Sequence, residues 1–224
     1  MDFATDTSVG EIASKHPLST RVFHRHGIDF CCGGGVSLNE ACAKRGLQGE
    51  GVLSEITDEL SKSVDKGKRW DEAPLGELID FILIEFHAPL KIELPRLREM
   101  AMKVHAVHGP KDPENLAELS KLVQWLATEL DQHLLKEEEI LFPMVKAGQG
   151  GTANGPVTVM EDEHVHAGEA LRRLRELTNN YTVPAEACNT WTALWHGLEA
   201  LEESLHQHIH LENNILFPRA LAGK

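Results

Sequence analysis

The sequence predicts an all-α protein in which a four-helix bundle follows a small helical N-terminal domain. Residues 132–143 (QHLLKEEEILFP) recur as residues 207–218 (QHIHLENNILFP). A second pair of segments, residues 87–99 and 164–176, repeats at a similar spacing. No stretch shows a convincing strand pattern. Two copies of a two-helix unit make four helices, related by a pseudo-two-fold axis and able to hold a site in the bundle core.

The composition is ordinary for a globular protein, with 42% hydrophobic and 25% charged residues among 224. A formal net charge of −13 argues against nucleic acid or an anionic membrane surface as a partner. No apolar run approaches the ~20 residues of a membrane span, and the first residues lack the pattern of a signal peptide. The expected location is therefore the cytoplasm. The cysteines, Cys31, Cys32, Cys42 and Cys188, form no paired framework, which fits a reducing compartment.

Residues 1–64 predict a small domain of short helices. Ser8 is a suitable N-cap for the first of them. Residues 28–35 (IDFCCGGG) predict a loop, because three consecutive glycines disfavour a helix. A domain of this size is marginal on its own, so we expect it to lean on the bundle or on a second subunit of a homodimer. The expected helices cover residues 8–15, 17–27, 37–45 and 52–64.

Residues 65–73 are polar, contain a glycine and predict a linker. The bundle is therefore expected to span residues 74–224. Its first helix contains Pro89 and Pro95, which predict a bend. The four bundle helices are expected at residues 74–103, 113–148, 156–179 and 184–223.

The repeated segments carry residues that ligate metals. His133 and Glu137 recur as His208 and Glu212, and a spacing of four places each pair on one helix face. The preceding helices carry one histidine each on an apolar stripe. A buried glutamate is costly unless it is paired or bound to metal, so we predict a two-metal site. The predicted ligands are His87, His133, Glu137, His164, His208 and Glu212. The apolar stripes include Ile84 and Leu90 beside His87, and Leu130, Ile140 and Leu141 beside His133.

The kind of metal follows from the kind of ligand. Imidazole and carboxylate suit iron, zinc, copper or manganese, and the His-Glu-x-x-His helix of zinc proteases is absent. Ferritin-like sites combine four carboxylates with two histidines, whereas this set inverts that balance. Its two carboxylates offset half the formal charge of two ferrous ions and leave room for an anionic bridge or a bound diatomic. This favours a non-haem di-iron centre, with zinc and manganese as alternatives.

The remaining histidines and cysteines are expected outside this set. His108 follows His87 by 21 residues, which is ~32 Å along a helix that rises ~1.5 Å per residue. Cys31 and Cys32 are expected in an exposed loop suited to thiol redox chemistry, metal binding or metal transfer; the alternative is a buried pair in a tight turn. Residues assigned to the surface or to a second layer are His105, His166, His196, His206 and His210. Residues assigned to packing are Cys42, Cys188, Trp125, Trp191 and Trp195.

Four stretches of this sequence match a known family. They are residues 29–34 (DFCCGG), 136–144 (KEEEILFPM), 178–180 (TNN) and 211–223 (LENNILFPRALAG). Over essentially its whole length the chain resembles the repair-of-iron-centres di-iron proteins (the YtfE/ScdA/DnrN group), whose C-terminal domain is hemerythrin-like.

This resemblance implies a cytoplasmic, stress-induced protein with two iron ions in an oxo- and carboxylate-bridged, non-haem centre. It places the ligands at the six residues named above and links Cys31 and Cys32 to the repair or delivery step. Members are associated with restoring iron–sulfur clusters damaged by nitric oxide or peroxide. The implied partners are nitric oxide or another diatomic, and damaged iron–sulfur proteins. The family also has a histidine matching His108, and Pro89 departs from the helix former expected there.

The function within this class stays open at the level of sequence. The chain donates iron or handles nitric oxide, and thereby protects iron–sulfur enzymes. Alternatively, it is an enzyme, a di-iron nitric oxide reductase, or a reversible binder or sensor of nitric oxide or oxygen. Cys31 and Cys32 are then candidates for contact with the recipient cluster or with nitric oxide. A purely structural bundle leaves two buried glutamates without an explanation.

Overall fold

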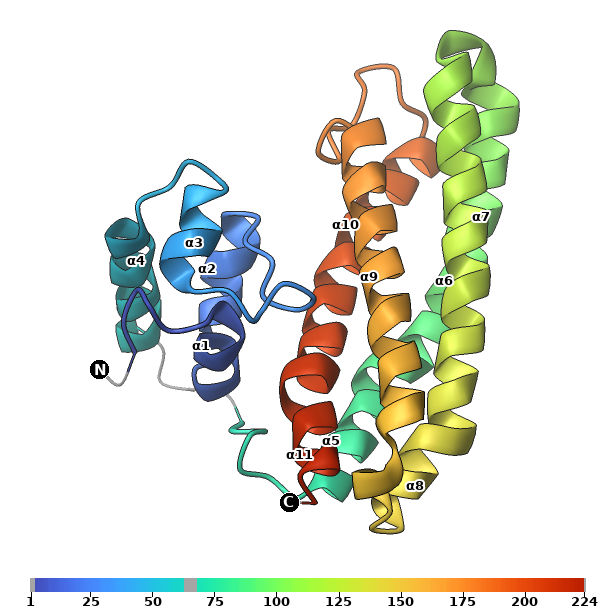
Figure 1. Cartoon of the computed structure of the whole chain (residues 1–224). Coiled ribbons are helices and arrows are strands. Elements are labelled where there is room, and N and C mark those ends of the chain that lie inside the picture. The colour runs from blue at the N-terminus through green and yellow to red at the C-terminus, as the bar shows by residue number, and fades with distance from the viewer. Residues whose placement is uncertain (1–2, 63–67, 224) are drawn as a thin grey trace.

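The computed structural model describes residues 3–62 and 68–223, and it confirms the all-α fold class. A bundle of long helices and a body of short N-terminal helices lie side by side (Figure 1). Over the described ranges the only extended pairing is an isolated bridge between Ser8 and Ser37. Within those ranges no helix is long and apolar enough to cross a membrane.

The N-terminal body is built from four helices joined by capped turns. Ser8 Oγ accepts the Glu11 N–H, as the N-cap prediction requires, and Ser37 caps a later helix in the same way. The core includes Ile12, Phe23 and Ile56, none of which is exposed to solvent. The helices are α1 (Val9–Lys15), α2 (Ser19–Arg25), α3 (Leu38–Ala43) and α4 (Gly49–Lys62). The predicted helix at 52–64 and the predicted linker at 65–73 both extend into residues 63–67, which lie outside the described part. The remainder of the predicted linker, residues 68–73, contains turns.

The bundle follows the predicted order of four long helices, although each is interrupted or shifted. The first comprises α5 (Leu75–Ile82), η1 (Leu83–His87) and α6 (Ala88–His108), and the short η2 (Gly109–Lys111) follows it. The second comprises α7 (Pro113–Lys136), η3 (Glu137–Leu141) and α8 (Phe142–Lys146), followed by η4 (Gly150–Thr152). The third is α9 (Asn154–Leu177), and the fourth comprises α10 (Asn189–Leu211), η5 (Glu212–Leu216) and α11 (Phe217–Leu221).

Two predicted boundaries of these helices are wrong. The first helix continues to His108 rather than ending at residue 103. The fourth begins at residue 189 rather than 184. Asn179, Asn180 and Tyr181 all have positive φ angles, of 48°, 57° and 55°, and turn the chain back toward the bundle. The loop between α9 and α10 is therefore longer than the sequence pattern predicted, and α10 begins later.

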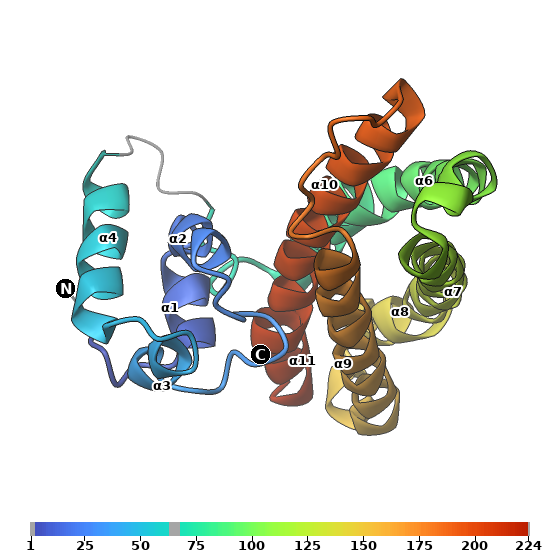
Figure 2. The same cartoon turned by 90° about the horizontal axis from the view of Figure 1, so that it is seen from above.

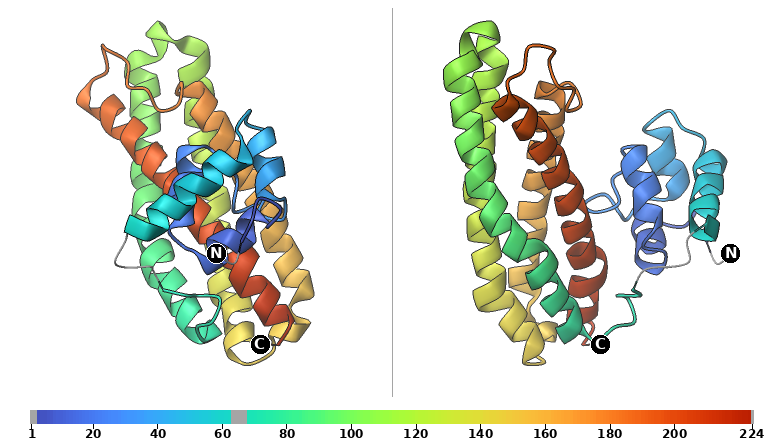
Figure 3. Two further views of the ribbon diagram at one scale, coloured as in Figure 1. Left: turned by 90° about the vertical axis from the view of Figure 1, so that its left-hand side faces the viewer. Right: turned by 180° about the vertical axis from the view of Figure 1, so that it is seen from behind.

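Three segments of the bundle are π-helical turns, which the sequence reading missed. They are η1, η3 and η5, and a proline follows each one in the first turn of the next helix. Proline has no N–H to donate and crowds the carbonyl four residues earlier, and a wider π turn relieves both problems. The helix formed by α5, η1 and α6 also changes direction along its length, consistent with the predicted bend (Figure 3). These prolines, Pro89, Pro143 and Pro218, are a sequence signal that could have located the π turns.

The π turns also explain two wrong core assignments. Ile84 is 65% exposed and Ile140 is 51% exposed, although the helical period placed both on ligand stripes. A π turn contains an extra residue and so shifts the helical phase locally. Ile84 and Ile140 point outward, whereas Leu90 and Leu141 on the same predicted stripes stay buried. Ile215, the repeat partner of Ile140, is only 2% exposed. Its side of the bundle is covered by the N-terminal body.

The N-terminal body packs on its own bundle. Figure 2 shows α1 and the loop after α2 facing α10 and α11, with α4 on the far side. Asn214 Nδ2 donates to the carbonyls of Phe30 and Cys31, each at 3.2 Å. Arg219 donates to the carbonyls of Trp70 and Ala73, at 2.8 and 2.7 Å, and fixes the segment that enters the bundle. The loop that carries the cysteine pair is thereby held against the helices that carry the predicted ligands.

Candidate metal centre

Six polar side chains meet in the middle of the bundle, between two apolar clusters that fill its ends. All six are buried, with exposures between 0% and 3%: His87, His133, Glu137, His164, His208 and Glu212. His87, Glu137 and Glu212 lie in π turns, His133 and His208 lie in the last turn of the α-helix before one, and His164 lies in the middle of α9. The structure thus brings together every residue that the sequence predicted as a ligand.

The six residues form two overlapping groups of possible metal ligands. One group is His87, Glu137, His208 and Glu212, and the other is His133, Glu137, His164 and Glu212. Within each group the candidate ligand atoms lie within 4.8 Å of one another. Both glutamates belong to both groups, so the arrangement is consistent with a di-metal site whose two positions share both carboxylates.

Individual distances support this arrangement. The Nε2 atoms of His87 and His208 are 3.1 Å apart, and so are those of His133 and His164. Glu137 Oε2 lies 3.4 Å from Nε2 of both His87 and His133. Each imidazole pair directs its Nε2 atoms at one metal position, and Glu137 lies between the two positions.

Glu212 spans the same two positions from the other side. Its Oε1 lies 2.9 Å from His208 Nε2, and its Oε2 lies 3.3 Å from His164 Nε2. Each carboxylate therefore reaches one histidine of each pair. Glu212, like Glu137, is thus shared between the two groups.

The polar atoms of this site fit bound cations. Both oxygens of Glu137 and Oε2 of Glu212 are buried without a hydrogen-bond partner in the described structure. Burial, followed by the charge of Glu212, raises the pKa of Glu137 well above its usual range. Burial, followed by His164, lowers the pKa of His133 to about 4 and keeps that imidazole in its neutral, ligating form. Buried carboxylates without partners are destabilising, and two divalent cations would satisfy them.

The outer nitrogens of His87, His133 and His164 have side-chain partners that the sequence analysis did not assign. His87 Nδ1 lies 2.9 Å from Glu138 Oε1, and His133 Nδ1 lies 2.9 Å from Glu163 Oε2. Each of these carboxylates also pairs with a lysine, Lys91 and Lys136 respectively. Carboxylate–histidine pairs fix the ring and raise its basicity toward a metal. The sequence offered a signal for these partners, because Glu138 directly follows the predicted ligand Glu137 and Glu163 directly precedes the predicted ligand His164.

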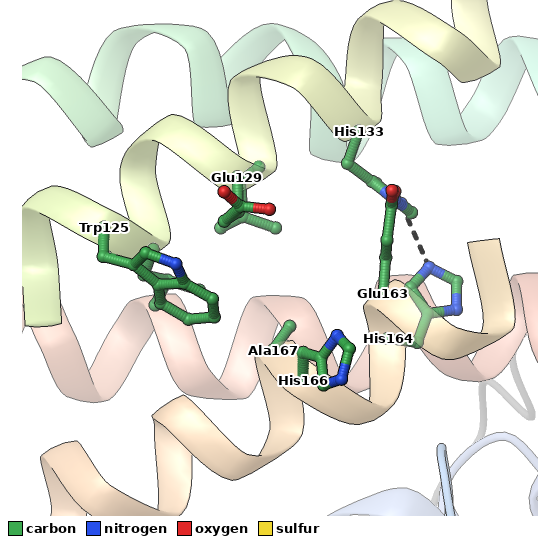
Figure 4. Close-up of a pocket in the computed structure, with 9 residues that line it drawn as sticks. Trp125, Glu129, His133, Glu163, His164, His166 and Ala167 are labelled. Atoms are coloured by element: carbon green, nitrogen blue, oxygen red, sulfur yellow. Dashed lines mark hydrogen bonds and ion pairs between the residues drawn. The ribbon is translucent and has the colours of Figure 1, made fainter. Parts of the chain in front are cut away.

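A cleft leads from the bundle surface to one side of the centre. Figure 4 shows Trp125, Glu129 and His166 along it, with His133 and His164 at its inner end. The prediction that Trp125 serves only packing is wrong, because it is 42% exposed. Trp191 and Trp195 are buried, as predicted.

The cysteine loop is docked rather than exposed, which corrects the sequence-based expectation. Cys31 is 4% exposed and Cys32 is half-buried. Asp29 Oδ1 accepts the N–H groups of Cys31, Cys32 and Gly33 at 3.0–3.1 Å, which fixes the turn. The two sulfurs are 3.8 Å apart, and the Cys32 thiol donates to the carbonyl of His164 at 3.4 Å. The pair therefore adjoins the helix that carries a predicted ligand.

The two thiols should differ in reactivity. The contact with Cys32, followed by burial, raises the pKa of Cys31 well above its usual range. The thiol of Cys31 conversely stabilises a thiolate at Cys32 and lowers the pKa of Cys32 despite burial. Because the thiolate is the nucleophile, we expect iodoacetamide to modify Cys32 before Cys31, in a mass-spectrometric time course at pH 7–8. Faster modification of Cys31 would contradict this assignment.

The other candidates lie away from the centre. His108 is not near the ligands, as predicted, and its Nε2 lies 3.2 Å from Cys188 Sγ. Cys188 was assigned to the core, but it is exposed, because it is the N-cap of α10 at the end of the bundle. His210 is buried between the two bodies, where Asn214 Nδ2 donates to its Nδ1. Cys42 is buried, as predicted.

Comparison with known proteins agrees with the fold and with the buried His/Glu groups. Residues 78–220 match the hemerythrin HHE cation binding domain, and residues 5–60 match a domain of unknown function named ScdA_N. The chain is 43% identical over 219 residues to the iron–sulfur cluster repair protein YtfE of Escherichia coli O157:H7, covering 98% of both chains. The proteins of the same name from Citrobacter koseri and Shigella boydii serotype 4 are 42% and 43% identical over the same share.

Proposed function

This chain belongs to the family of the iron–sulfur cluster repair protein YtfE, and on that premise we propose that it holds two non-haem iron ions and restores iron–sulfur clusters damaged by nitrosative or oxidative stress. It does so by donating iron or by handling nitric oxide. The observation that carries this proposal is the pair of buried His/Glu groups that share both glutamates. A His/Glu site of the hemerythrin type is compatible with a di-metal centre, and iron is the metal that we propose for it.

Each ligand has a distinct role in this proposal. His87 and His208 would hold one iron, and His133 and His164 would hold the other. The two glutamates would be shared between them, which the 2.9–3.4 Å contacts between carboxylate and imidazole support. Two carboxylates leave a pair of ferrous ions with a net positive charge. The centre therefore retains affinity for a further anionic or diatomic ligand.

The surrounding residues control access to the centre. Two iron ions supply sites that bind a diatomic molecule and exchange electrons with it. The apolar clusters above and below the ligands keep bulk water away. The cleft past Trp125 and Glu129 supports entry of a small molecule toward His133 and His164. Glu138 and Glu163 hold a proton at Nδ1 of two ligands and so keep their Nε2 atoms free for metal.

Cys31 and Cys32 are the proposed point of contact with a damaged iron–sulfur protein. Their location next to His164 supports this role, because a recipient that engages the loop comes close to the centre. All four cysteines are free thiols, which supports a location in the cytoplasm. The proposed partners are nitric oxide or another diatomic, and the damaged iron–sulfur proteins themselves.

A transfer experiment tests the proposal. The protein is loaded with ⁵⁷Fe, which we expect to reach about two ions per chain, as the geometry of two groups requires. It is then mixed anaerobically with an iron–sulfur enzyme whose cluster nitric oxide has damaged. We expect ⁵⁷Fe in the restored cluster, and a lower yield with Cys31→Ser and Cys32→Ser. Restored clusters without ⁵⁷Fe would exclude iron donation and leave nitric oxide handling. Zinc, or no metal, in the protein as isolated would contradict the whole proposal.

A second candidate function is a di-iron nitric oxide reductase, or a reversible binder or sensor of nitric oxide or oxygen. The cleft that reaches His133 and His164 favours it, because diatomic access is not needed for iron donation. Steady formation of nitrous oxide with an electron donor would identify the reductase. Complete release of nitric oxide without loss of iron would identify the reversible binder.

A further inference from the structure

The two metal positions differ in how the outer nitrogens of their histidines are held. At the His133/His164 position both rings have partners, because His133 Nδ1 contacts Glu163 and His164 Nδ1 contacts Asn213 Oδ1 at 2.7 Å. At the His87/His208 position His87 Nδ1 contacts Glu138. His208 Nδ1 is buried without a partner in the described structure. The ring of His208 is positioned by stacking on Phe86, with centroids 5.3 Å apart.

The side chain of Asn213 contacts both the bundle and the N-terminal body. Its side-chain oxygen can only accept, so His164 Nδ1 carries the hydrogen and Nε2 is left to face the metal position. Its side-chain nitrogen donates to the carbonyl of Cys31, although this bond is long at 3.4 Å. The same amide therefore orients a ligand on one side and touches the cysteine loop on the other.

Two further contacts join the cysteine loop to the same region. The Cys32 thiol donates to the main-chain carbonyl of His164 at 3.4 Å. Asn214, next to Asn213 in η5, donates to the carbonyls of Phe30 and Cys31. Within residues 3–62 and 68–223, by contrast, no hydrogen bond joins the N-terminal body to His87, to His208 or to Glu138.

These contacts make one metal position sensitive to the docking of the N-terminal domain. Removing an outer partner of a histidine ligand lowers metal affinity by about 10–100-fold, because the ring loses its orientation. When the cysteine loop leaves, Asn213 loses its hydrogen bond to the Cys31 carbonyl, which limits rotation of its amide. The main-chain carbonyl of His164 also loses the hydrogen bond from the Cys32 thiol. The hydrogen bonds of His87 and His208 involve residues of the bundle alone and are kept.

We propose that Asn213 is a positioning residue that links the docked cysteine loop to the His133/His164 position, so that the metal at this position is retained only while the N-terminal domain is docked. The metal at the His87/His208 position is retained independently of docking. Given the proposed function, on which this consequence rests, a recipient that engages Cys31 and Cys32 displaces the loop and releases one iron of the two.

Metal release without any recipient protein tests this proposal. The full chain is loaded anaerobically with ferrous ion and mixed with an excess of a chromogenic ferrous chelator, and absorbance follows the release. With Asn213→Ala we expect half of the bound iron to leave at least about 10-fold faster than in the unsubstituted chain, and the other half to leave at an unchanged rate. With Glu138→Ala, which removes the acceptor for His87 Nδ1, we expect acceleration of the opposite half, so that the double variant loses both halves quickly.

Asn214→Ala is the matched control for docking, because Asn214 touches the loop but no predicted ligand. It should accelerate release of the same half of the bound iron as Asn213→Ala, by a smaller factor. Asn213→Asp keeps the acceptor for His164 but loses the donor to the Cys31 carbonyl. It should retain iron at this position better than Asn213→Ala and less well than the unsubstituted chain. Circular dichroism of each variant establishes that the bundle is folded.

Two results would overturn the inference. One is an equal effect of Asn213→Ala on both halves, or no effect on either. The other is unchanged release from Asn214→Ala, which would show that docking does not matter. Failure of iron transfer to a recipient, with the half-release pattern intact, would instead overturn the proposed function alone. An unsubstituted chain that does not hold two ferrous ions would overturn both.

Discussion

Replacing Glu212 by alanine is expected to remove both metals from the protein. Glu212 belongs to both groups of ligands, with its two oxygens 2.9 and 3.3 Å from His208 and His164. The loss of affinity should exceed the about 10–100-fold that follows removal of an outer partner, because a bridging ligand is lost at each position. Metal analysis of the purified variant should therefore find far less than one ion per chain.

Glu139→Ala is the matched control, since Glu139 lies in the same π turn as Glu137 but is exposed and belongs to neither group. It should leave the metal content unchanged. A Glu212→Ala protein that still holds two metals would contradict the assignment of the bridging carboxylates.

A substitution at the other shared glutamate, Glu137, should separate metal binding from stability. Without metal, Glu137 and Glu212 are two carboxyl groups buried together, which is unfavourable. Burial and Glu212 raise the pKa of Glu137, so folding without metal must protonate this carboxyl group or bury its charge. Glu137→Gln removes that cost at nearly constant volume, so the metal-free variant should unfold at a higher temperature than the metal-free unsubstituted chain. The unsubstituted chain should gain roughly 4 kcal/mol when free metal exceeds Kd a thousandfold, and the variant should gain much less. Calorimetry with and without metal measures both effects.

Replacing Gly34 by alanine is expected to separate the N-terminal domain from the bundle. A Cβ at this position would lie 2.7 Å from Asn214 Oδ1 and 2.8 Å from the carbonyl oxygen of Phe30. The second of these is backbone within the tight cysteine loop and cannot move aside easily. Overpacking of this kind costs about 1–3 kcal/mol, which is comparable to what a few interdomain hydrogen bonds contribute. Small-angle X-ray scattering should show a larger radius of gyration.

Gly35→Ala is the control for this experiment, because a Cβ at Gly35 would meet nothing within 4 Å. It should leave the radius of gyration unchanged. An unchanged radius of gyration for Gly34→Ala as well would show that the loop accommodates the added carbon and that the interface does not depend on this close approach.

Much of the metal centre was predictable from local spacing. The repeat of His133 and Glu137 as His208 and Glu212 requires only that the segments be helical, since a separation of four residues places two side chains on one face. The helical class followed from the same periodicity. The outer partners Glu138 and Glu163 adjoin predicted ligands in the chain, yet their roles depend on which neighbouring helix each one faces.

The sequence by itself therefore determined the fold class, the duplicated hairpins and the six residues that meet in the core. Only the tertiary structure decided how these residues are grouped. Each metal position combines histidines from different repeats, His87 with His208 and His133 with His164, because α6 packs on α10 and α7 packs on α9. The tertiary structure also decided that the cysteine loop is buried against α9. The His87–His208 contact and the Cys32–His164 contact join segments more than a hundred residues apart, and His133 and His164 come from different helices 31 residues apart. Helical periodicity carries no information about such contacts.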